Sequence, residues 1–244
     1  MRAYLLGETL KYRRTLVGKI PLLAPLGTIL AALILMPAYF TVNGYNWWYV
    51  FLLPGTAALL AGLMVEGEEK SHWGGVHSLD LSFEKLWAAK VAVAGGYLLL
   101  AIALHLLGMV LLQGLLPRQL GGNYPPGQLA LASGILFLTS LWQLPLCLHL
   151  AKSWGLFLTV MVHSALSFLL GIFTWDGALG PLLPQSWAMG AMVEVLGILP
   201  SGIPTDGGGT ALSWGLVRAC ALSAALCLLG TWATGKWFSR REAP

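Results

Sequence analysis

Long apolar stretches, separated by short polar or charged segments, make up most of this chain. A helix needs about 20 predominantly apolar residues to cross roughly 30 Å of hydrocarbon, and six stretches are long enough. We therefore expect six membrane-spanning helices, with Pro21 breaking the chain before the first of them; their approximate ranges are 22–40, 46–65, 86–115, 129–150, 155–174 and 213–234. The pattern predicts an all-α integral membrane protein in which residues 1–244 form one transmembrane domain.

The N-terminal segment, residues 1–19, has a different pattern. Leu6 and Leu10 fall on one helical stripe, while Glu8 and Lys11 fall elsewhere. Such a pattern is typical of a helix that lies along the membrane surface. We expect an interfacial helix here, and the alternative is a basic leader that only sets the topology. The basic residues of this helix include Lys11, Arg13 and Arg14.

The longest stretch outside the predicted spans is residues 175–212. Within it, "SWAMGAMVEVLGIL" (186–199) is apolar and helical in pattern, but it is too short to cross a bilayer and lies between Pro184 and Pro200. Non-helical backbone persists at membrane depth only where protein or water covers it. We expect a short helix or re-entrant hairpin packed at one face of the membrane, before the last span.

The distribution of basic residues predicts the orientation. Cytoplasmic loops of membrane proteins are enriched in lysine and arginine. One side of the predicted topology has only Arg118 and Arg218, whereas the other has twelve lysines and arginines. We therefore expect both termini in the cytoplasm, which agrees with an even number of spans. The twelve lie in segments 1–19, 66–90, 150–154 and 235–244.

Composition excludes a soluble protein. The chain is 57% hydrophobic and only 10% charged, whereas a soluble domain is about 25% charged.

The three cysteines lie in apolar runs. Cys220 and Cys227 are seven residues apart, or about 10 Å along a helix, which is too far for a disulfide.

Charged residues gather in "VEGEEKSHWGGVHSL", residues 65–79. Glu68 and His72 have the i, i+4 spacing of two ligands on one helical face, but a zinc site needs three or four ligands. A membrane-embedded hydrolase using His105 and His163 is a second interpretation, although neither histidine has an acidic neighbour in the sequence. The third interpretation is a docking surface for another protein on the cytoplasmic side, in the predicted loop 66–85.

Ion-coupled transport is disfavoured. No predicted span carries an acidic residue near its centre, where ionisable groups mark proton and ion relays. The spans also show no internal repeat, which many secondary transporters have. A transporter of this kind would need an external source of energy.

The whole chain resembles the permease subunits of ABC-2-type exporters, most closely the lantibiotic-immunity group. The resemblance rests on "ETLKYRRT" (8–15), "NWWYVFLLPG" (46–55), "EGEEK" (66–70) and "LPQSWAMGAMVEVLGILPSGIP" (183–204). The chain departs from the pattern of this group at Gly190, where a basic or bulky residue is expected. It implies six spans in a type V exporter-like architecture, completed by a paralogous permease or a second copy of the chain.

The resemblance also implies partners and sites. Separate ATPase subunits would bind ATP and Mg²⁺, so this chain would carry no cofactor and no catalytic residue. Glu68, Glu69 and Lys70 would begin a helix that docks on the ATPase and continues to about Lys85. The predicted coupling residues are Glu66, Glu68, Glu69, Lys70, His72, Trp73 and Leu79.

The implied substrate is a cationic, amphipathic peptide antibiotic, removed from the membrane for self-immunity. The predicted substrate-facing residues of the outer loop are Asp176, Trp187, Glu194 and Asp206. An ABC-2 permease for a drug, a lipid or a polysaccharide precursor is the closest alternative. The other explanation of the acidic residues in the outer loop is that they are simply solvated and do not contact a substrate.

Overall fold

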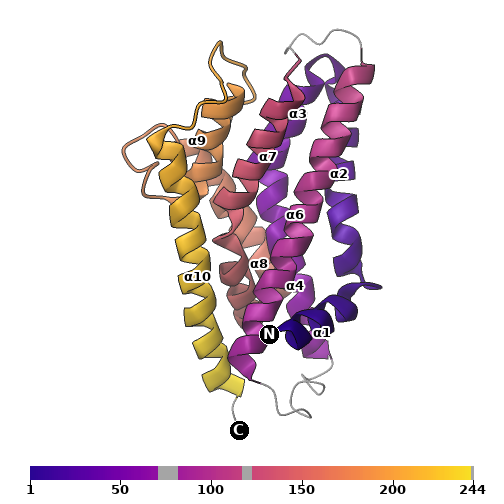
Figure 1. The fold of residues 1–244 in the computed structure, drawn as a ribbon, viewed down its shortest axis with the longest axis vertical. Helices are drawn as coiled ribbons and strands as arrows, with labels where there is room; N and C mark the ends of the chain where they lie inside the picture. Colours follow the sequence, from indigo (N-terminus) through magenta and orange to yellow (C-terminus); the bar gives the residue numbers. More distant parts are fainter. Residues whose placement is uncertain (71–81, 117–122, 243–244) are drawn as a thin grey trace.

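The computed structural model describes residues 1–70, 82–116 and 123–242. In these ranges the chain is helical and contains no strand, apart from one isolated bridge between Ile198 and Pro204. Figure 1 shows an upright bundle with both chain termini at the same end. The helices are α1 (Arg2–Tyr12), α2 (Leu16–Leu35), η1 (Pro37–Tyr39), α3 (Phe40–Trp47), η2 (Trp48–Leu52), α4 (Leu53–Lys70), α6 (Phe83–Leu115), α7 (Pro126–Ser140), α8 (Gln143–Thr174), α9 (Pro184–Leu196) and α10 (Trp214–Glu242).

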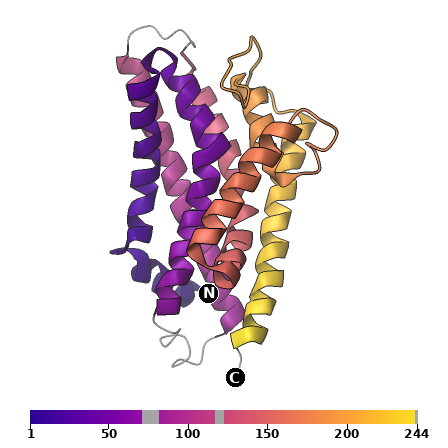
Figure 2. The ribbon, with the colours of Figure 1, turned by 180° about the vertical axis from the view of Figure 1, so that it is seen from behind.

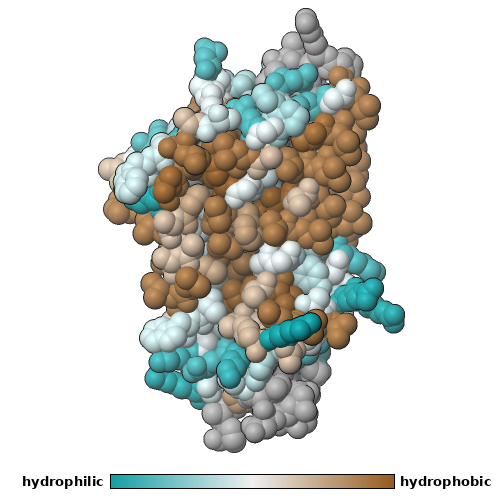
Figure 3. Space-filling model, in the orientation of Figure 1, coloured by the Kyte–Doolittle hydropathy of each residue, from teal (hydrophilic) through white to brown (hydrophobic). Residues whose placement is uncertain are grey.

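Five helical stretches of the described chain are long and apolar enough to cross a membrane: Leu16–Leu35, Pro37–Lys70, Phe83–Leu115, Gln143–Thr174 and Trp214–Arg241. On the face seen in Figure 3, hydrophobic residues form a broad middle band and hydrophilic residues lie toward both ends. These are the features of an all-α, multi-pass membrane protein, as the sequence predicted. We call the end that carries both termini the basic end, and the opposite end the α9 end (Figure 1).

The first long helix differs from the predicted span 22–40. The expectation that Pro21 breaks the chain was wrong: α2 begins at Leu16, after the extended residue Thr15, and Pro21 lies inside it. A proline removes one backbone donor, and membrane helices tolerate this where neighbouring groups satisfy the freed carbonyl. The helix ends at Leu35 because Met36 precedes Pro37 and leaves the helical region, with φ −145° and ψ 59°.

The second stretch is longer than the predicted span 46–65, because helical turns continue from Pro37 to Lys70. It includes a π-helical turn, η2, in which the N–H of Leu53 bonds to the carbonyl of Trp48, five residues back. Pro54 follows immediately and cannot donate a backbone hydrogen bond. Such a wider turn lets the helix pass a proline without ending.

The third long helix, α6, covers the predicted span 86–115 and begins three residues earlier, at Phe83. Ser82 caps its N-terminus by accepting a hydrogen bond from the backbone N–H of Lys85. Its 33 residues extend for about 50 Å, which is more than the hydrocarbon thickness. The helix therefore projects beyond the apolar band or tilts within it.

The predicted span 129–150 is interrupted after Ser140, whereas the predicted span 155–174 corresponds to the helical part of α8 after Gly155. α7 ends at Ser140, and α8 begins at Gln143 and contains a non-helical residue, Gly155, with φ 82° and ψ 173°. Residues 20 positions apart on one straight helix would be about 30 Å apart, yet Nε2 of His163 lies 3.0 Å from Oε1 of Gln143. The part of α8 after Gly155 therefore folds back beside the part before it (orange in Figure 2).

The segment 175–212 contains the expected short helix, α9, at residues 184–196. Thirteen residues cover about 20 Å and do not cross a bilayer. α9 ends at Gly197 in the left-handed conformation, and the loop that follows leads to α10. Compared with the predicted span 213–234, α10 continues to Glu242.

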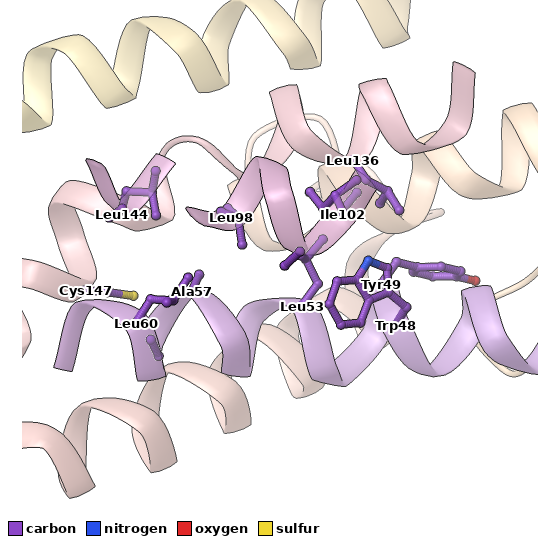
Figure 4. Packing of buried hydrophobic residues seen from close by; sticks show 14 of the residues in the cluster. Trp48, Tyr49, Leu53, Ala57, Leu60, Leu98, Ile102, Leu136, Leu144 and Cys147 are labelled. Carbon is purple, nitrogen blue, oxygen red and sulfur yellow. The ribbon is translucent and has the colours of Figure 1, made fainter. Parts of the chain in front are cut away.

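The core of the bundle surrounds η2 and α4, the most buried of the long stretches. Figure 4 shows Trp48, Leu53 and Ala57 among side chains from α6, α7 and α8. α4 packs closely against α8 along its length, since Gly62 leaves room for Leu156. α10 lies at the edge of the bundle and is the least buried. Small residues that let helix backbones approach are the usual basis of packing in a membrane.

Candidate functional site

Four charged side chains and a tyrosine meet at the basic end, where α1 lies against α4 and α6. Nζ of Lys90, from α6, is fully buried and lies 2.7 Å from Glu8 Oε2, 2.7 Å from Glu68 Oε1 and 2.8 Å from the Tyr12 hydroxyl. Nζ of Lys11 lies 2.7 Å from Glu8 Oε1 and 2.8 Å from Glu68 Oε1. We call these five residues the ion cluster. It contains two positive and two negative charges, so the burial of each charge is compensated.

Within the ion cluster, the pKa values of Lys11 and Tyr12 are both raised. Burial lowers the pKa of Lys11, but hydrogen bonds and attraction to Glu68 and Glu8 outweigh this and raise the pKa above its usual 10.5. A raised lysine pKa adds stability that is complete below the unfolded-state value and is lost only as pH rises through the folded-state value. Burial and the neighbouring carboxylates also raise the pKa of the Tyr12 hydroxyl. Tyr12 therefore stays neutral, donating to Glu8 and accepting from Lys90.

The ion cluster joins α1 to the two helices on either side of residues 71–81. Glu68 lies two residues before the end of α4, and Lys90 lies in the second turn of α6. A second contact supports the same arrangement, because the Tyr4 hydroxyl accepts a hydrogen bond from the backbone N–H of Ser82 at the start of α6. α1 therefore contacts the helices at both edges of that segment, and separating it from them would break buried ion pairs.

The predicted coupling residues have different environments. The expectation that Glu68, Glu69 and Lys70 begin a docking helix was wrong, because α4 continues through them and ends at Lys70. Glu68 is buried in the ion cluster, where it pairs with Lys90. Glu69 Oε1 pairs with Lys152 Nζ of α8 at 2.6 Å. Lys70, which is 73% exposed, pairs with Glu66 at 3.0 Å.

The remaining predicted coupling residues, His72, Trp73 and Leu79, lie outside the described residues. The predicted interfacial helix is shorter than residues 1–19, since α1 ends at Tyr12 and α2 begins at Leu16. Arg13 and Arg14 lie between the two helices and are exposed. Leu6 and Leu10 of the predicted apolar stripe are 55% and 67% exposed, as expected of side chains that face lipid.

The sequence analysis missed Glu8 and Lys90 as partners, although each gave a signal. Glu8 is the one acid among the first 19 residues, and Lys90 is the one charged residue in 86–115. A charge inside an apolar helix requires a partner of opposite sign. Sequence alone could not show that α1 supplies one of these partners, because the spacing between residues 8 and 90 carries no periodic signal.

At the α9 end, the four predicted substrate-facing residues divide into two pairs. Asp176 and Asp206 are exposed. The carboxylate of Glu194 accepts hydrogen bonds from the backbone N–H and hydroxyl of Ser213, at 3.1 and 2.8 Å, and so fixes the start of α10. Trp187 is buried, and its Nε1 donates to the carbonyl of Pro181.

A cavity of about 170 Å³ opens beside these residues, and Trp187, Glu194 and Arg218 line it. Gly190 also lines it, and a side chain at that position would enter open space. The departure of the sequence at Gly190 thus leaves the cavity unfilled. Arg218 lines the same cavity as Glu194, and among the described residues Asp176 and Asp206 are the exposed acids of this end.

The two histidines of the hydrolase interpretation take part in packing. His105 is fully buried, its ring stacks on Trp48 at 4.7 Å, and its Nε2 lies 3.2 Å from the carbonyl oxygen of Gly44. His163 contacts Gln143. In the described part of the chain, neither histidine pairs with a carboxylate, and no group of three or more His, Cys, Asp or Glu side chains is placed to hold a metal ion.

Comparisons with protein-family models, curated proteins and solved structures find no match to this chain. The function is therefore inferred from the geometry of the basic end. The basic end combines a buried, charge-balanced connection among three helices with exposed charged residues at the end of α4. Such an arrangement is suited to transmitting a displacement from outside the membrane to the long helices.

Proposed function

We propose that this chain is the permease subunit of an ATP-driven ABC-2-type exporter with six membrane crossings in a type V exporter-like architecture. In this proposal α2, residues 37–70, α6 and α10 each cross once. α7 and residues 143–154 together make the fourth crossing, and residues 156–174 make the fifth. The fold-back of α8 at Gly155 supports this count.

The proposed location is the bacterial cytoplasmic membrane, with the basic end in the cytoplasm. At the α9 end, Arg218 is the one basic residue of the described chain. The basic end carries the other described lysines and arginines, in α1, the α1–α2 turn, the first turn of α2, the ends of α4, α6 and α10, and the α8 fold. This asymmetry is the one that places loops in the cytoplasm. α1 then lies along the inner membrane surface, and α9 packs at the outer face.

The observation that carries the proposal is the ion cluster. An exporter without its own ATPase must receive motion from a partner through its cytoplasmic surface. α4 ends at that surface with the exposed pair Glu66–Lys70, and the buried contacts of Glu68 and Lys90 connect this end to α6 and α1. A partner that displaces the end of α4 would therefore displace all three helices, because breaking a buried ion pair is costly.

The proposal is tested by purifying the tagged chain from native membranes in a mild detergent. We expect an ABC ATPase chain to co-purify, together with a second permease or a second copy of this chain, and the complex to hydrolyse ATP in the presence of Mg²⁺. Mass spectrometry identifies the partners, and phosphate release measures the activity. Repeated purification of the chain without any ATPase would contradict the proposed function.

Replacing both Glu66 and Lys70 by alanine should reduce substrate-stimulated ATP hydrolysis of the complex at least tenfold. Charged residues at such a surface fix the register of a partner, and truncating them removes about 1–2 kcal/mol of binding at each contact that the partner makes. Stability should change little, since exposed ion pairs contribute about 0–1 kcal/mol. The matched control is Arg240→Ala, an exposed charge at the same end. Unchanged hydrolysis in the double variant would exclude this docking surface while leaving the exporter itself testable by co-purification.

The substrate proposed is a cationic, amphipathic peptide antibiotic of the lantibiotic kind, exported for self-immunity. Asp176 and Asp206 support this class, because they give the α9 end an exposed negative charge. Replacing both by asparagine should lower the tolerance of cells to such a peptide several-fold, and replacing both by glutamate should preserve it. The minimum inhibitory concentration of the peptide measures the effect. Equal tolerance in all three strains would remove these acids from substrate binding.

A further inference from the structure

A cavity of about 630 Å³ forms a groove between α6 and α10 in the half of the bundle nearest the basic end. Ala92, Gly96 and Leu99 of α6 form one wall, Cys227 and Leu228 of α10 form the other, and α7 and α8 close the floor. A hydrogen bond of 2.8 Å from Trp87 Nε1 to Thr234 Oγ1 holds the two helices together near the basic end. The groove exists because small residues of α6 face α10 there.

The groove has the depth of one leaflet. From Lys85 to Leu99, both of which line it, the rise along α6 is about 21 Å, which matches the roughly 20 Å of one leaflet with its headgroup region. Toward the middle of the bundle its lining ends at Leu99 of α6, Phe137 of α7 and Cys227 of α10, close to the turn between α7 and α8. There the backbone N–H of Trp142 donates to the hydroxyl of Ser223, so α10 contacts the floor and the groove stops. Its occupant is therefore confined to one leaflet.

Charge is confined to the rim of the groove at the basic end. Glu84 and Lys85 line this rim, and Trp232 lines it from α10. Nζ of Lys236 lies 4.4 Å from the centre of the Trp232 ring, which places a second positive charge beside the rim. Two lysines against one glutamate leave a net positive rim above an apolar channel. That combination matches an amphiphile with an anionic head and apolar chains.

We propose that the groove binds an anionic phospholipid from the leaflet at the basic end, with its phosphate beside Lys85 and Lys236 and an acyl chain against Gly96. A transmembrane helix of a partner would need a channel through both leaflets, and the contact at Ser223 ends the groove midway. A cationic peptide would be repelled by the rim. The site is therefore distinct from the proposed substrate site, and it does not depend on the exporter proposal.

A second groove along α10 provides an internal comparison. It has a volume of about 420 Å³, lies between α7 and α10 toward the α9 end, and includes Gly134, Leu216 and Val217 in its lining. No charged residue lines it. It offers apolar surface without a partner for a headgroup, so we expect it to contact acyl chains without preference for headgroup charge.

Native mass spectrometry of the intact protein, released from vesicles of equal phosphatidylglycerol and phosphatidylcholine, tests the proposal. We expect the wild type to retain phosphatidylglycerol preferentially. Gly96→Trp should lose this lipid, because a side chain at that position enters open space in the groove. The control is Gly27→Trp, a lipid-facing glycine of α2 that also has open space around it and should behave as the wild type.

The lysine variants keep the test valid if Gly96→Trp fails to fold. Lys85→Gln and Lys236→Gln should each lower the preference for phosphatidylglycerol about fivefold, the effect of one lysine near an anionic lipid surface. Equal retention of phosphatidylglycerol in Gly96→Trp and the wild type would mean that this lipid binds only at the surface outside the groove. Unchanged preference for phosphatidylglycerol in both lysine variants would mean that the rim does not bind the headgroup. Disulfide-linked dimers of an Ala92→Cys variant in membranes would place a second copy in the groove. Each of these three results would overturn the proposal.

Discussion

Replacing Lys90 by methionine should destabilise the protein by about 3–5 kcal/mol, because removing one partner leaves Glu8 and Glu68 buried with too little positive charge. Lys90 is fully buried, and Glu8 is 1% exposed, so water cannot replace the missing ammonium group. Only Lys11, which is 42% exposed, would remain as a counter-charge. Thermal unfolding in detergent micelles or lipid nanodiscs measures the loss.

A control and a rescue separate the charge effect from packing. Lys85→Met, an exposed position on the same helix, should change stability by less than about 0.5 kcal/mol. Lys90→Met combined with Glu68→Gln should recover much of the loss, because the ion pair between Glu8 and Lys11 then remains balanced. If the double variant were as unstable as the sum of the single variants, the cause would be lost packing and not uncompensated charge.

The same variant separates folding from coupling. Tyr4 still contacts the N-terminus of α6 when Lys90 is replaced, so part of the attachment of α1 remains. If Lys90→Met folds at low temperature, α1 should separate more easily from the ends of α4 and α6, and hydrogen exchange of residues 2–12 should accelerate relative to the wild type. Unchanged exchange would show that the ion cluster does not hold α1 in place.

The length of the apolar runs predicted the membrane class and the approximate position of each long helix. It could not predict their ends, because ends depend on single residues. Pro21 stays within α2, whereas Pro37 ends it through the restriction that it imposes on Met36. Both prolines lie in apolar sequence. The residue before Pro21 remains helical in the folded chain, whereas the residue before Pro37 does not.

The charges show a similar limit. The sequence placed Glu68 in the charged segment at the basic end, as the structure does. Its burial was not predicted, because a cluster of charged residues usually lies in water. Its burial results from α1 folding back across α4, a contact between residues 57 positions apart. Pairing of this kind depends on tertiary geometry that residue spacing does not carry. The isolated lysine in α6 was the one local sign that such a partner exists.

Gly155→Ala should destabilise the protein by about 1–3 kcal/mol, the usual cost of a non-glycine residue in a backbone region that is essentially restricted to glycine. Gly155 has φ 82° and ψ 173° where α8 folds back. A Cβ atom at this position would meet nothing within 4 Å, so the cost is conformational and not steric contact with the rest of the protein.

Two further variants make this prediction specific. Gly114→Ala is the matched control, since Gly114 also has open space but lies within helix α6; alanine there should be neutral or stabilise by up to about 1 kcal/mol. Gly155→Asn should be as harmful as alanine, because asparagine tolerates the left-handed helical region near ψ of about 47°, and ψ of 173° at Gly155 is far from it. Unfolding by detergent denaturation measures all three. A stable Gly155→Ala variant would contradict the prediction and would mean that α8 can continue as one helix past residue 155. The contact between Gln143 and His163 would then be lost, because it requires the fold-back.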